Sequence, residues 1–471
     1  MEDTYIRFLL TNQEAQPLKL KLSSLAVAGV ILGTAVMPAH ASNDAMMSLL
    51  KVLRDQGTIT EQNYLLLVNA AKADEAASDA TVASVAKIDA DVKQVAEKLP
   101  KITTKGKIKI ADSDGNWSFQ PIGRVMWDAI DTDEDNSAAD EVHGTELRRA
   151  RLGLQGSIYD WGYKFEADFA GGDSSIKDAY LSYGTKLGDN KAGVKLGQSH
   201  IAFGLTAKIS SKYMSFMDRP LFSDSTVSPT RESGAALSLA AADYRWSLAA
   251  SLTNGSIDDG GTNNNGSTFA ARASYIPFMQ DKNHMLQVGA GYLTKGGGDE
   301  FRFRQRLVSH EDTTRHLDTG TVNDFDGADA FTVDAMAIMG PFHAMAEYLD
   351  YSVERTTANA SDIDIDGYAL EAGYFLTGES LKWKNGYTSG IAPASKSGAW
   401  QIAARFESTE IDGNTSSTTD EADKWTVGIN YYPTQNTRLM LNYDKVTDVT
   451  KNGVNVDFEP SSLKFRAQAY W

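Results

Sequence analysis

The feature that most constrains the fold of this chain is an alternation of apolar and polar residues, which continues from residue 104 to residue 471. In the closing stretch SSLKFRAQAYW, for example, Leu463, Phe465 and Trp471 alternate with Lys464 and Arg466. Successive side chains of a β-strand point to opposite faces of its sheet, so this period of two predicts strands. We count sixteen such segments, which begin near residues 119, 146, 161, 175, 191, 233, 244, 267, 285, 327, 342, 366, 398, 423, 437 and 462.

Most of these segments have about ten residues, the length of a tilted strand that crosses a lipid bilayer. Tight turns such as YDWG and YPTQ alternate with long polar loops, and only the segment 377–397 is long where a short turn is due. A soluble sandwich hides its apolar faces between two sheets, whereas a closed barrel in lipid turns them outward. The sequence therefore predicts an all-β fold, a 16-stranded antiparallel transmembrane β-barrel over residues 105–471, with the short turns on the periplasmic side.

The N-terminal region has the composition of an export signal. Lys19 and Lys21 precede the apolar run LSSLAVAGVILGTAVMP, and AHA at 39–41 has the small residues of a cleavage site. We expect residues 1–41 to be a signal peptide, which directs export through the periplasm to the outer membrane of a Gram-negative bacterium. No later segment has eighteen uninterrupted apolar residues, so we expect no membrane-spanning helix.

Residues 42–104 are predicted to form a periplasmic helical segment. Residues 45–72 indicate a short helix, a turn at Gly57 and a second helix that begins after Thr60. Two alternatives account for the apolar stripe that follows: a coiled coil, which would suit a trimeric protein, or a single amphipathic helix on the base of the barrel. The residues of this stripe, spaced by three and four positions, are Val85, Ile88, Val92, Val95 and Leu99.

The composition excludes several classes of function. The formal charge of -17 argues against a nucleic-acid-binding protein, because such proteins neutralise phosphates with basic residues. The chain has no Cys, which excludes disulfides and thiolate metal ligands. The seven His are scattered without metal-ligand spacing, and no catalytic constellation stands out. We therefore expect a protein that is not an enzyme and that carries no cofactor and no metal.

The polar face of the predicted strands would line the lumen of the barrel, and we assign more basic than acidic residues to it. Rings of Arg and Lys favour anions in a pore, and a planar guanidinium binds phosphate oxygens in pairs. The alternative is that these cations pair with acids of neighbouring strands and only rigidify the barrel. Closure of the barrel would bring five of them into one basic stripe: Arg124, Arg149, Arg151, Lys464 and Arg466.

Two long loops add further basic residues. The third loop, 198–231, contains four of them, and FRFRQR at 301–306 alternates Phe with Arg. This second motif either extends a strand above the membrane or bends inward as an anion-collecting vestibule. The full set of candidates for pore lining and anion binding is Arg124, Arg149, Arg151, Lys164, Lys208, Lys212, Arg219, Arg231, Arg304, Arg306, Arg405, Lys464 and Arg466.

From ELRRARLGLQGSIYDWGYKFEADFAGGDSSIKDAYLSYG (146–184), through VKLGQSHIAFGLTAKISSKYMSFMDRP (194–220) to YFLTGES (374–380), the chain resembles the phosphate-selective porin O/P family. The order of the motifs, rather than any single one, carries the resemblance. It implies a trimeric outer-membrane porin in which an inward-folded third loop narrows the lumen. Ala202 departs from the pattern, since a proline commonly precedes this Phe-Gly.

The resemblance and the basic lumen together predict passive diffusion of small anions, phosphate or related oxyanions above all. The expected partners are these anions, outer-membrane lipid and lipopolysaccharide, and further copies of the chain in a homotrimer. Two other functions stay open: a general, organic-acid or sugar porin, and a structural envelope barrel tethered through its N-terminal helices.

Overall fold

The computed structural model describes residues 40–134, 141–223, 226–259, 266–312, 314–357, 360–413 and 419–471. The chain divides into two compact units, Met1–Leu99 and Pro100–Trp471. The expected signal peptide lies outside the described residues, except for residues 40 and 41, with which the first described helix begins.

The N-terminal unit is a helical hairpin of α2 (His40–Asp55) and α3 (Glu61–Lys98). The predicted turn is present: Gly57 has a φ of 75°, and its N–H donates to the carbonyl of Arg54 at 2.9 Å. The Thr60 hydroxyl accepts the N–H of Asn63 at 3.2 Å and so caps α3. The helix continues without a break to the residue before Leu99, so the second predicted helix and the apolar stripe belong to one element. No helix of the described chain is long and apolar enough to span a bilayer.

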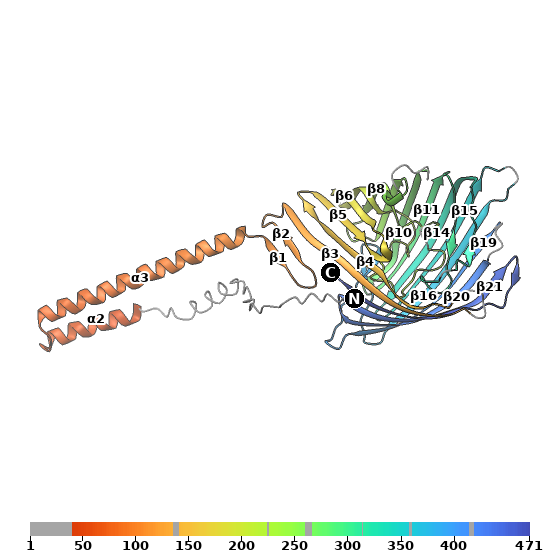
Figure 1. Cartoon of the computed structure of the whole chain (residues 1–471). Helices are drawn as coiled ribbons and strands as arrows, with labels where there is room; N and C mark the ends of the chain where they lie inside the picture. Colours follow the sequence, from red (N-terminus) through yellow and green to blue (C-terminus); the bar gives the residue numbers. More distant parts are fainter. Residues whose placement is uncertain are drawn as a thin grey trace, which may run out of the picture. The chain divides into compact units, whose positions relative to one another are not determined.

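Within the described residues of the second unit, sixteen antiparallel strands pair in chain order and close into a barrel when the last strand pairs with the first (Figure 1). A small hairpin, β1 (Lys101–Thr103) and β2 (Lys109–Ala111), precedes them and pairs with the first barrel strand. The barrel strands are β3 (Trp117–Asp133), β4 (His143–Ile158), β5 (Trp161–Asp168), β6 (Ser175–Leu187), β7 (Asn190–His200), β8 (Arg231–Ala240), β9 (Trp246–Thr253), β10 (Thr268–Asp281), β11 (His284–Gly296), β14 (Phe325–Met339), β15 (Phe342–Arg355), β16 (Ile363–Phe375), β19 (Ala399–Asp412), β20 (Thr419–Thr434), β21 (Thr437–Lys451) and β23 (Ser461–Tyr470).

The predicted 16-stranded barrel is thus confirmed, and its seam is well defined. β23 pairs with β3 along its whole length, from Ser461 opposite Asp133 to Tyr470 opposite Arg124. Trp471 extends the seam, because its N–H donates to the carbonyl of Gly123 at 3.1 Å and its own carbonyl accepts from Gly123 at 3.3 Å. A Cβ at Gly123 would lie 2.3 Å from the Trp471 ring, so only glycine fits there.

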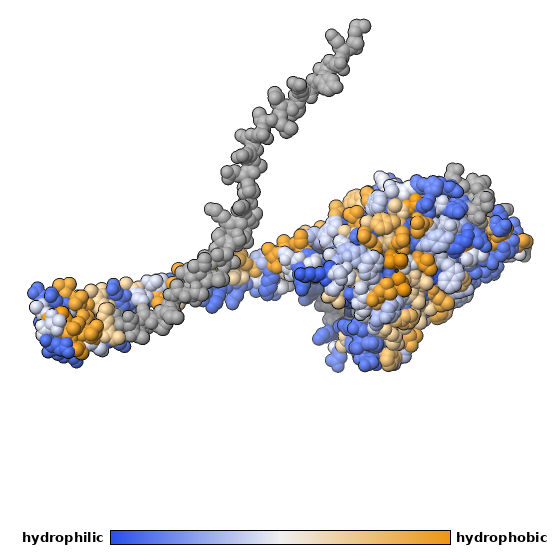
Figure 2. Space-filling view, turned by 90° about the horizontal axis from the view of Figure 1, so that it is seen from below, coloured by the Kyte–Doolittle hydropathy of each residue, from blue (hydrophilic) through white to orange (hydrophobic). Residues whose placement is uncertain are grey.

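The alternation in the sequence becomes an inside and an outside. On β23, Lys464 and Arg466 face the lumen and are 2% and 0% exposed, whereas Leu463 faces outward and is 48% exposed. Trp400, Trp425 and other large apolar residues are likewise exposed, and apolar residues gather on the outer surface of the barrel (Figure 2). An outer surface of this kind is stable in lipid, where the closed strands satisfy every backbone group.

The described residues of loop L3, 201–223 and 226–230, pack inside the barrel, as the family resemblance implies. Side chains of the wall hold its backbone: Glu347 of β15 accepts the N–H of Leu205 at 2.6 Å, and Glu407 of β19 accepts that of Leu221 at 2.8 Å. On β23, the guanidinium of Arg466 donates to the carbonyl of Met217 at 2.8 Å. L3 is therefore fixed to the wall by buried hydrogen bonds rather than by apolar packing alone.

The described residues of loop L5, 297–312 and 314–324, also bend inward. This agrees with the inward-bending alternative for FRFRQR, whose collection of anions stays a prediction. L5 contains the short strands β12 (Arg304–Gln305) and β13 (Leu317–Asp318). The Phe301 ring stacks on Tyr351 of β15 with centroids 5.8 Å apart, and the carbonyl of Val308 accepts from the ammonium of Lys464 at 2.9 Å. Three arginines of the loop, Arg304, Arg306 and Arg315, line one cavity together with residues of L3.

The exceptional segment on the short-turn side is a hairpin, which we call the turn hairpin (residues 376–398). Its strands are β17 (Lys382–Lys384) and β18 (Tyr387–Ser389). The Trp383 indole is 5% exposed and donates to Gln287 of β11 at 3.0 Å. Leu381, Trp383 and Ile391 share one apolar cluster with Leu205 and Ile209 of L3, so the hairpin and L3 meet inside the barrel.

Candidate functional site

The most basic feature of the lumen is a cavity of about 340 Å³ between the wall, L3 and L5. Asp218 is its one carboxylate among the described residues, and this carboxylate binds the ammonium of Lys464 at 2.7 Å. We call this space the cationic cavity. Its cationic side chains are Arg148, Arg149, Arg219, Arg304, Arg306, Arg315 and Lys424.

A β-bulge brings two arginines of β4 to this cavity. The register between β3 and β4 shifts where Met126 pairs with Arg149 and Trp127 pairs with Leu147, so Arg148 is the extra residue. A regular strand would turn Arg148 away from the face that carries Arg149. Within the described residues, neither side chain forms an ion pair, and the Nε atoms of both are buried without a hydrogen-bond partner. Sequence alternation alone misses Arg148, because a bulge leaves no mark in the period of two.

The loops supply the remaining arginines with different degrees of anchoring. Arg219 donates to three carbonyls of its own loop, including that of Ile209 at 2.7 Å, so it braces L3. Burial and repulsion from Arg231 lower the pKa of Arg219 to about 9, which leaves it charged at neutral pH. Arg306 donates to the carbonyl of Asp312. Arg304 is exposed and forms no ion pair with the described residues, so its guanidinium stays available in the cavity.

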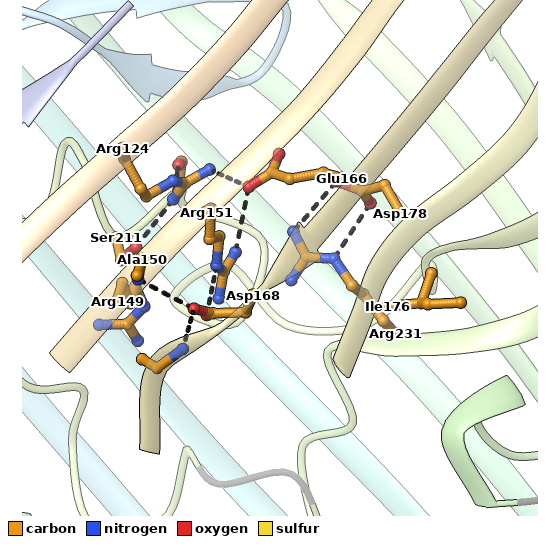
Figure 3. A network of polar contacts seen from close by, with 12 residues as sticks. Arg124, Arg149, Ala150, Arg151, Glu166, Asp168, Ile176, Asp178, Ser211 and Arg231 are labelled. Carbon is orange, nitrogen blue, oxygen red and sulfur yellow. Dashed lines mark hydrogen bonds and ion pairs between the residues drawn. The ribbon is translucent and has the colours of Figure 1, made fainter. Parts of the chain in front are cut away.

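A second polar region extends along β3 to β8, where cations and carboxylates alternate (Figure 3). Glu166 binds Arg124 at 2.9 Å and Arg151 at 3.4 Å. Arg151 also binds Asp168 at 2.7 Å, and Arg149 lies beside this network without a carboxylate of its own (Figure 3).

The network continues toward the start of β8. Asp178 binds Lys164 at 2.6 Å and Arg231 at 3.0 Å. Lys164 also reaches Glu166 at 3.0 Å, which joins the two halves. Most cations of this wall are therefore paired. This agrees with the alternative that such cations pair with acids of neighbouring strands and rigidify the barrel.

Two further members of the predicted stripe, Lys464 and Arg466, are paired as well, and so is Arg405, which lies outside the stripe. Arg466 binds Asp128 through two hydrogen bonds of 2.7 and 2.6 Å, and Lys464 binds Asp444 at 2.6 Å. Arg405 binds Glu407 at 3.1 Å and lies over the Phe216 ring of L3. The structure brings the stripe together, as expected, but carboxylates neutralise four of its five members.

Two lysines of L3 remain without an ion pair within the described residues. Lys208 lies over the Tyr387 ring of the turn hairpin at 5.7 Å, and Lys212 lies over the Tyr470 ring at 5.0 Å. Burial and repulsion from Arg124 lower the pKa of Lys212 to about 8. Lys212 is therefore a cation that titrates close to physiological pH.

A closed barrel with a girdle of apolar residues outside, a polar lumen and two inward loops defines the class of outer-membrane channels. The family model described as phosphate-selective porin O and P matches residues 119–471. The chain belongs to this family and is an outer-membrane porin of a Gram-negative bacterium, not an enzyme.

The individual relatives share about a quarter of their residues with this chain. Porin O of Pseudomonas aeruginosa is 26% identical over 391 residues, which cover 74% of this chain and 88% of that protein. An uncharacterized protein of Caulobacter vibrioides is 25% identical over 466 residues, covering 91% of this chain and 90% of its own. Among solved structures, an anion-selective porin from Comamonas acidovorans aligns with a TM-score of 0.49 at 12% identity, over 75% of this chain and 100% of that one.

Proposed function

We propose that this porin passes small anions by diffusion, phosphate and related oxyanions in particular. The observation that carries the proposal is the cationic cavity, which is lined by seven cationic side chains and one carboxylate. One of the seven, Lys424, also pairs with Glu407 at 3.0 Å. L3 and L5 narrow the lumen there, so a permeating ion passes close to these groups. Guanidinium groups bind phosphate oxygens in a planar, two-point geometry, which favours oxyanions over chloride.

The candidate residues then divide by role. Arg149, Arg304 and Arg306 line the cationic cavity. Lys208 and Lys212 belong to L3 and lie closer to the short-turn side of the barrel, beside the rings of Tyr387 and Tyr470. The paired cations shape the wall and hold the loops. These supporting residues are Arg124, Arg151, Lys164, Arg219, Arg231, Arg405, Lys464 and Arg466.

Planar-bilayer recording with a salt gradient tests the anion preference. We expect a reversal potential of the sign that marks anion permeation, and a chloride current that falls as millimolar phosphate is added. Arg304→Gln should weaken both, because it removes a free guanidinium. Arg302→Gln is the matched control, since Arg302 lies two residues away and its ion pair with Asp318 occupies it. Cation preference in the unmodified protein would refute the proposal.

A porin for organic acids or sugars is the rival function. The pairing of Arg124, Arg151, Lys164 and Arg231 with carboxylates favours it, because it leaves much of the wall close to neutral. Weak anion preference and a chloride current unaffected by phosphate would support this rival over the first proposal.

We further infer that residues 42–104 form a periplasmic segment whose α3 helices associate in a homotrimer. The side chains of Ile88, Val92 and Val95 are 50–61% exposed in the single chain, and a parallel coiled coil would bury them. Deletion of residues 42–99 should then reduce the trimer fraction in light scattering while the conductance per pore stays the same. Unchanged trimers would contradict this role, and loss of envelope integrity with trimers intact would favour tethering.

We also propose that residues 1–41 are a signal peptide. N-terminal sequencing of protein taken from the membrane should begin at Ser42. A sequence that begins with Met1 would refute cleavage.

A further inference from the structure

A separate cluster of charged groups lies on the long-loop side of the barrel. Glu134 follows β3 directly, and Asp312 and His316 belong to L5. Nε2 of His316 is 3.7 Å from a carboxylate oxygen of Glu134 and 3.9 Å from one of Asp312. The three groups thus converge although Glu134 is far from the other two in the sequence, which is why the spacing of the His residues does not reveal them.

Both carboxylates of this cluster are buried, and within the described residues three of their four oxygens lack a hydrogen-bond partner. Glu134 is 2% exposed and Asp312 is 0% exposed. Within the described residues, no hydrogen bond reaches either carboxylate oxygen of Glu134, Oδ2 of Asp312 or Nε2 of His316. A buried polar atom without a partner is unfavourable, and more so when it is charged. Two neighbouring carboxylates also repel each other, so a cation between them would remove both costs.

The surrounding structure holds each of the three residues in place. Oδ1 of Asp312 accepts the N–H of Thr314 at 2.8 Å. The carbonyl of His316 accepts from Thr419 at the start of β20 at 3.1 Å, and its ring packs against Phe458 at 4.8 Å. Glu134 comes directly after the strand that closes the barrel. Such support preorganises a binding site.

We propose that Glu134, Asp312 and His316 bind one divalent transition-metal ion of the zinc class. One imidazole and two carboxylates suit zinc, whereas calcium and magnesium prefer oxygen ligands alone. Bonds of about 2.1 Å in a tetrahedral site place ligand atoms about 3.4 Å apart. The ligand atoms of the three residues already lie within 4.8 Å of one another, so a bound ion would draw them together. The ion's charge balances that of the two carboxylates.

The bound ion would connect the end of β3 to L5, which carries Arg304, Arg306 and Arg315 into the cationic cavity. Arg306 is joined to the site directly, because it donates to the carbonyl of Asp312. Metal binding would therefore fix the position of these arginines. This consequence is independent of which anion the pore prefers.

The test uses the full chain without a histidine tag, in detergent, after treatment with a chelator. Calorimetric titration with zinc chloride should give one ion per chain, and cobalt chloride should produce the visible absorption of a tetrahedral site. His316→Gln should abolish the cobalt signal and weaken zinc binding at least tenfold. His284→Gln is the matched control and should bind normally, because this histidine begins β11 on the short-turn side of the barrel and pairs with Asp281.

Glu134→Gln serves as a second variant that keeps the side-chain shape and removes one ligand charge, and it should also weaken binding. Absence of saturable zinc binding in the unmodified protein would overturn the proposal. So would zinc affinities of the His316→Gln and Glu134→Gln variants that equal the affinity of the unmodified protein. Binding of calcium but not zinc would refute the metal class. Loss of binding in His310→Gln alone would assign the ion to the neighbouring group of Glu146, His310 and Glu311 instead.

Discussion

The lumen faces of two parts of the barrel differ sharply. On β19 to β23, L3, L5 and the turn hairpin cover the wall, and Arg405, Arg438 and Arg466 are no more than 3% exposed. On β5 to β8, the loops leave the wall partly uncovered: the side chains of Lys164 and Arg231 are 19% and 15% exposed, and Lys195 is exposed. The same kinds of residue line both faces, so the difference comes from the loops.

The comparison shows that a lumenal cation has two separate uses. On the covered wall, cations donate to loop carbonyls, as Arg438 does to Met214 at 2.5 Å, and they hold the constriction in place. On the uncovered wall, the ammonium of Lys195 lies over the Tyr180 ring and can meet a passing ion. Loss of a covered cation should therefore reduce stability, whereas loss of an uncovered one should change selectivity.

The largest expected effect is that of Arg466→Ala on the covered wall. It would leave Asp128 buried without its partner and the carbonyl of Met217 without its donor. Breaking a buried pair in this way costs about 3–5 kcal/mol. Heat-modifiability on gels and thermal unfolding in detergent should show the loss. Arg245→Ala, which removes an exposed pair with Asp243, should cost less than about 1 kcal/mol, and an equal loss would contradict the comparison.

Glu347→Ala should have the next largest effect, because it frees the start of L3. The carboxylate accepts from the N–H groups of Leu205 and Thr206 at 2.6 and 2.9 Å, and losing both bonds costs about 1–3 kcal/mol. We expect larger and noisier single-channel currents as L3 leaves the wall. An unchanged current would show that apolar packing alone holds the loop.

Lys195→Glu on the uncovered wall should change selectivity and leave stability nearly unaffected. A charge reversal beside the path of an ion is worth on the order of 1 kcal/mol, so the anion-to-cation permeability ratio should fall roughly fivefold. Reversal potentials measure this ratio. The matched control is Lys93→Glu on α3, which should leave the permeability ratio unchanged. A fall in the thermal stability of Lys195→Glu would contradict the proposed difference between the two walls.

The smallest effect should come from pH. Because the pKa of Lys212 is lowered to about 8, its charge is present at pH 7 and lost by pH 9. Anion conductance should therefore decline over that interval, by less than about twofold since other cations remain. Lys212→Arg stays charged and should remove the decline. A pH dependence that persists in this variant would point to another group.

The strands could be predicted from the sequence because lipid imposes one rule on all of them. Predicted starts near residues 191, 342 and 462 correspond to observed starts at Asn190, Phe342 and Ser461. The last strand, which ends beside Trp471, could be predicted for the same reason, because successive residues of a barrel strand face lipid and lumen in turn.

The partners of lumenal charges could not be predicted in this way. Arg124 pairs with Glu166 two strands away, and Arg438 meets the carbonyl of Met214 in L3. Such contacts depend on how a loop without periodicity packs, and Arg148 reaches the cationic cavity only through a bulge. The length of the segment 377–397 identifies it as an exception among the short turns. The sequence around Trp383, however, does not indicate that this side chain is buried. The sequence therefore identifies which cations face inward, and the loops decide what each one does.

The contact between the turn hairpin and L3 has a consequence for assembly. These segments enter the bore from opposite mouths and share one apolar cluster, so neither reaches its final packing before the other. We expect the interior to consolidate as a single late step after the wall has formed. Trp383 is the one tryptophan below 9% exposure in the described chain, and its fluorescence in a variant without the other indoles would time that step.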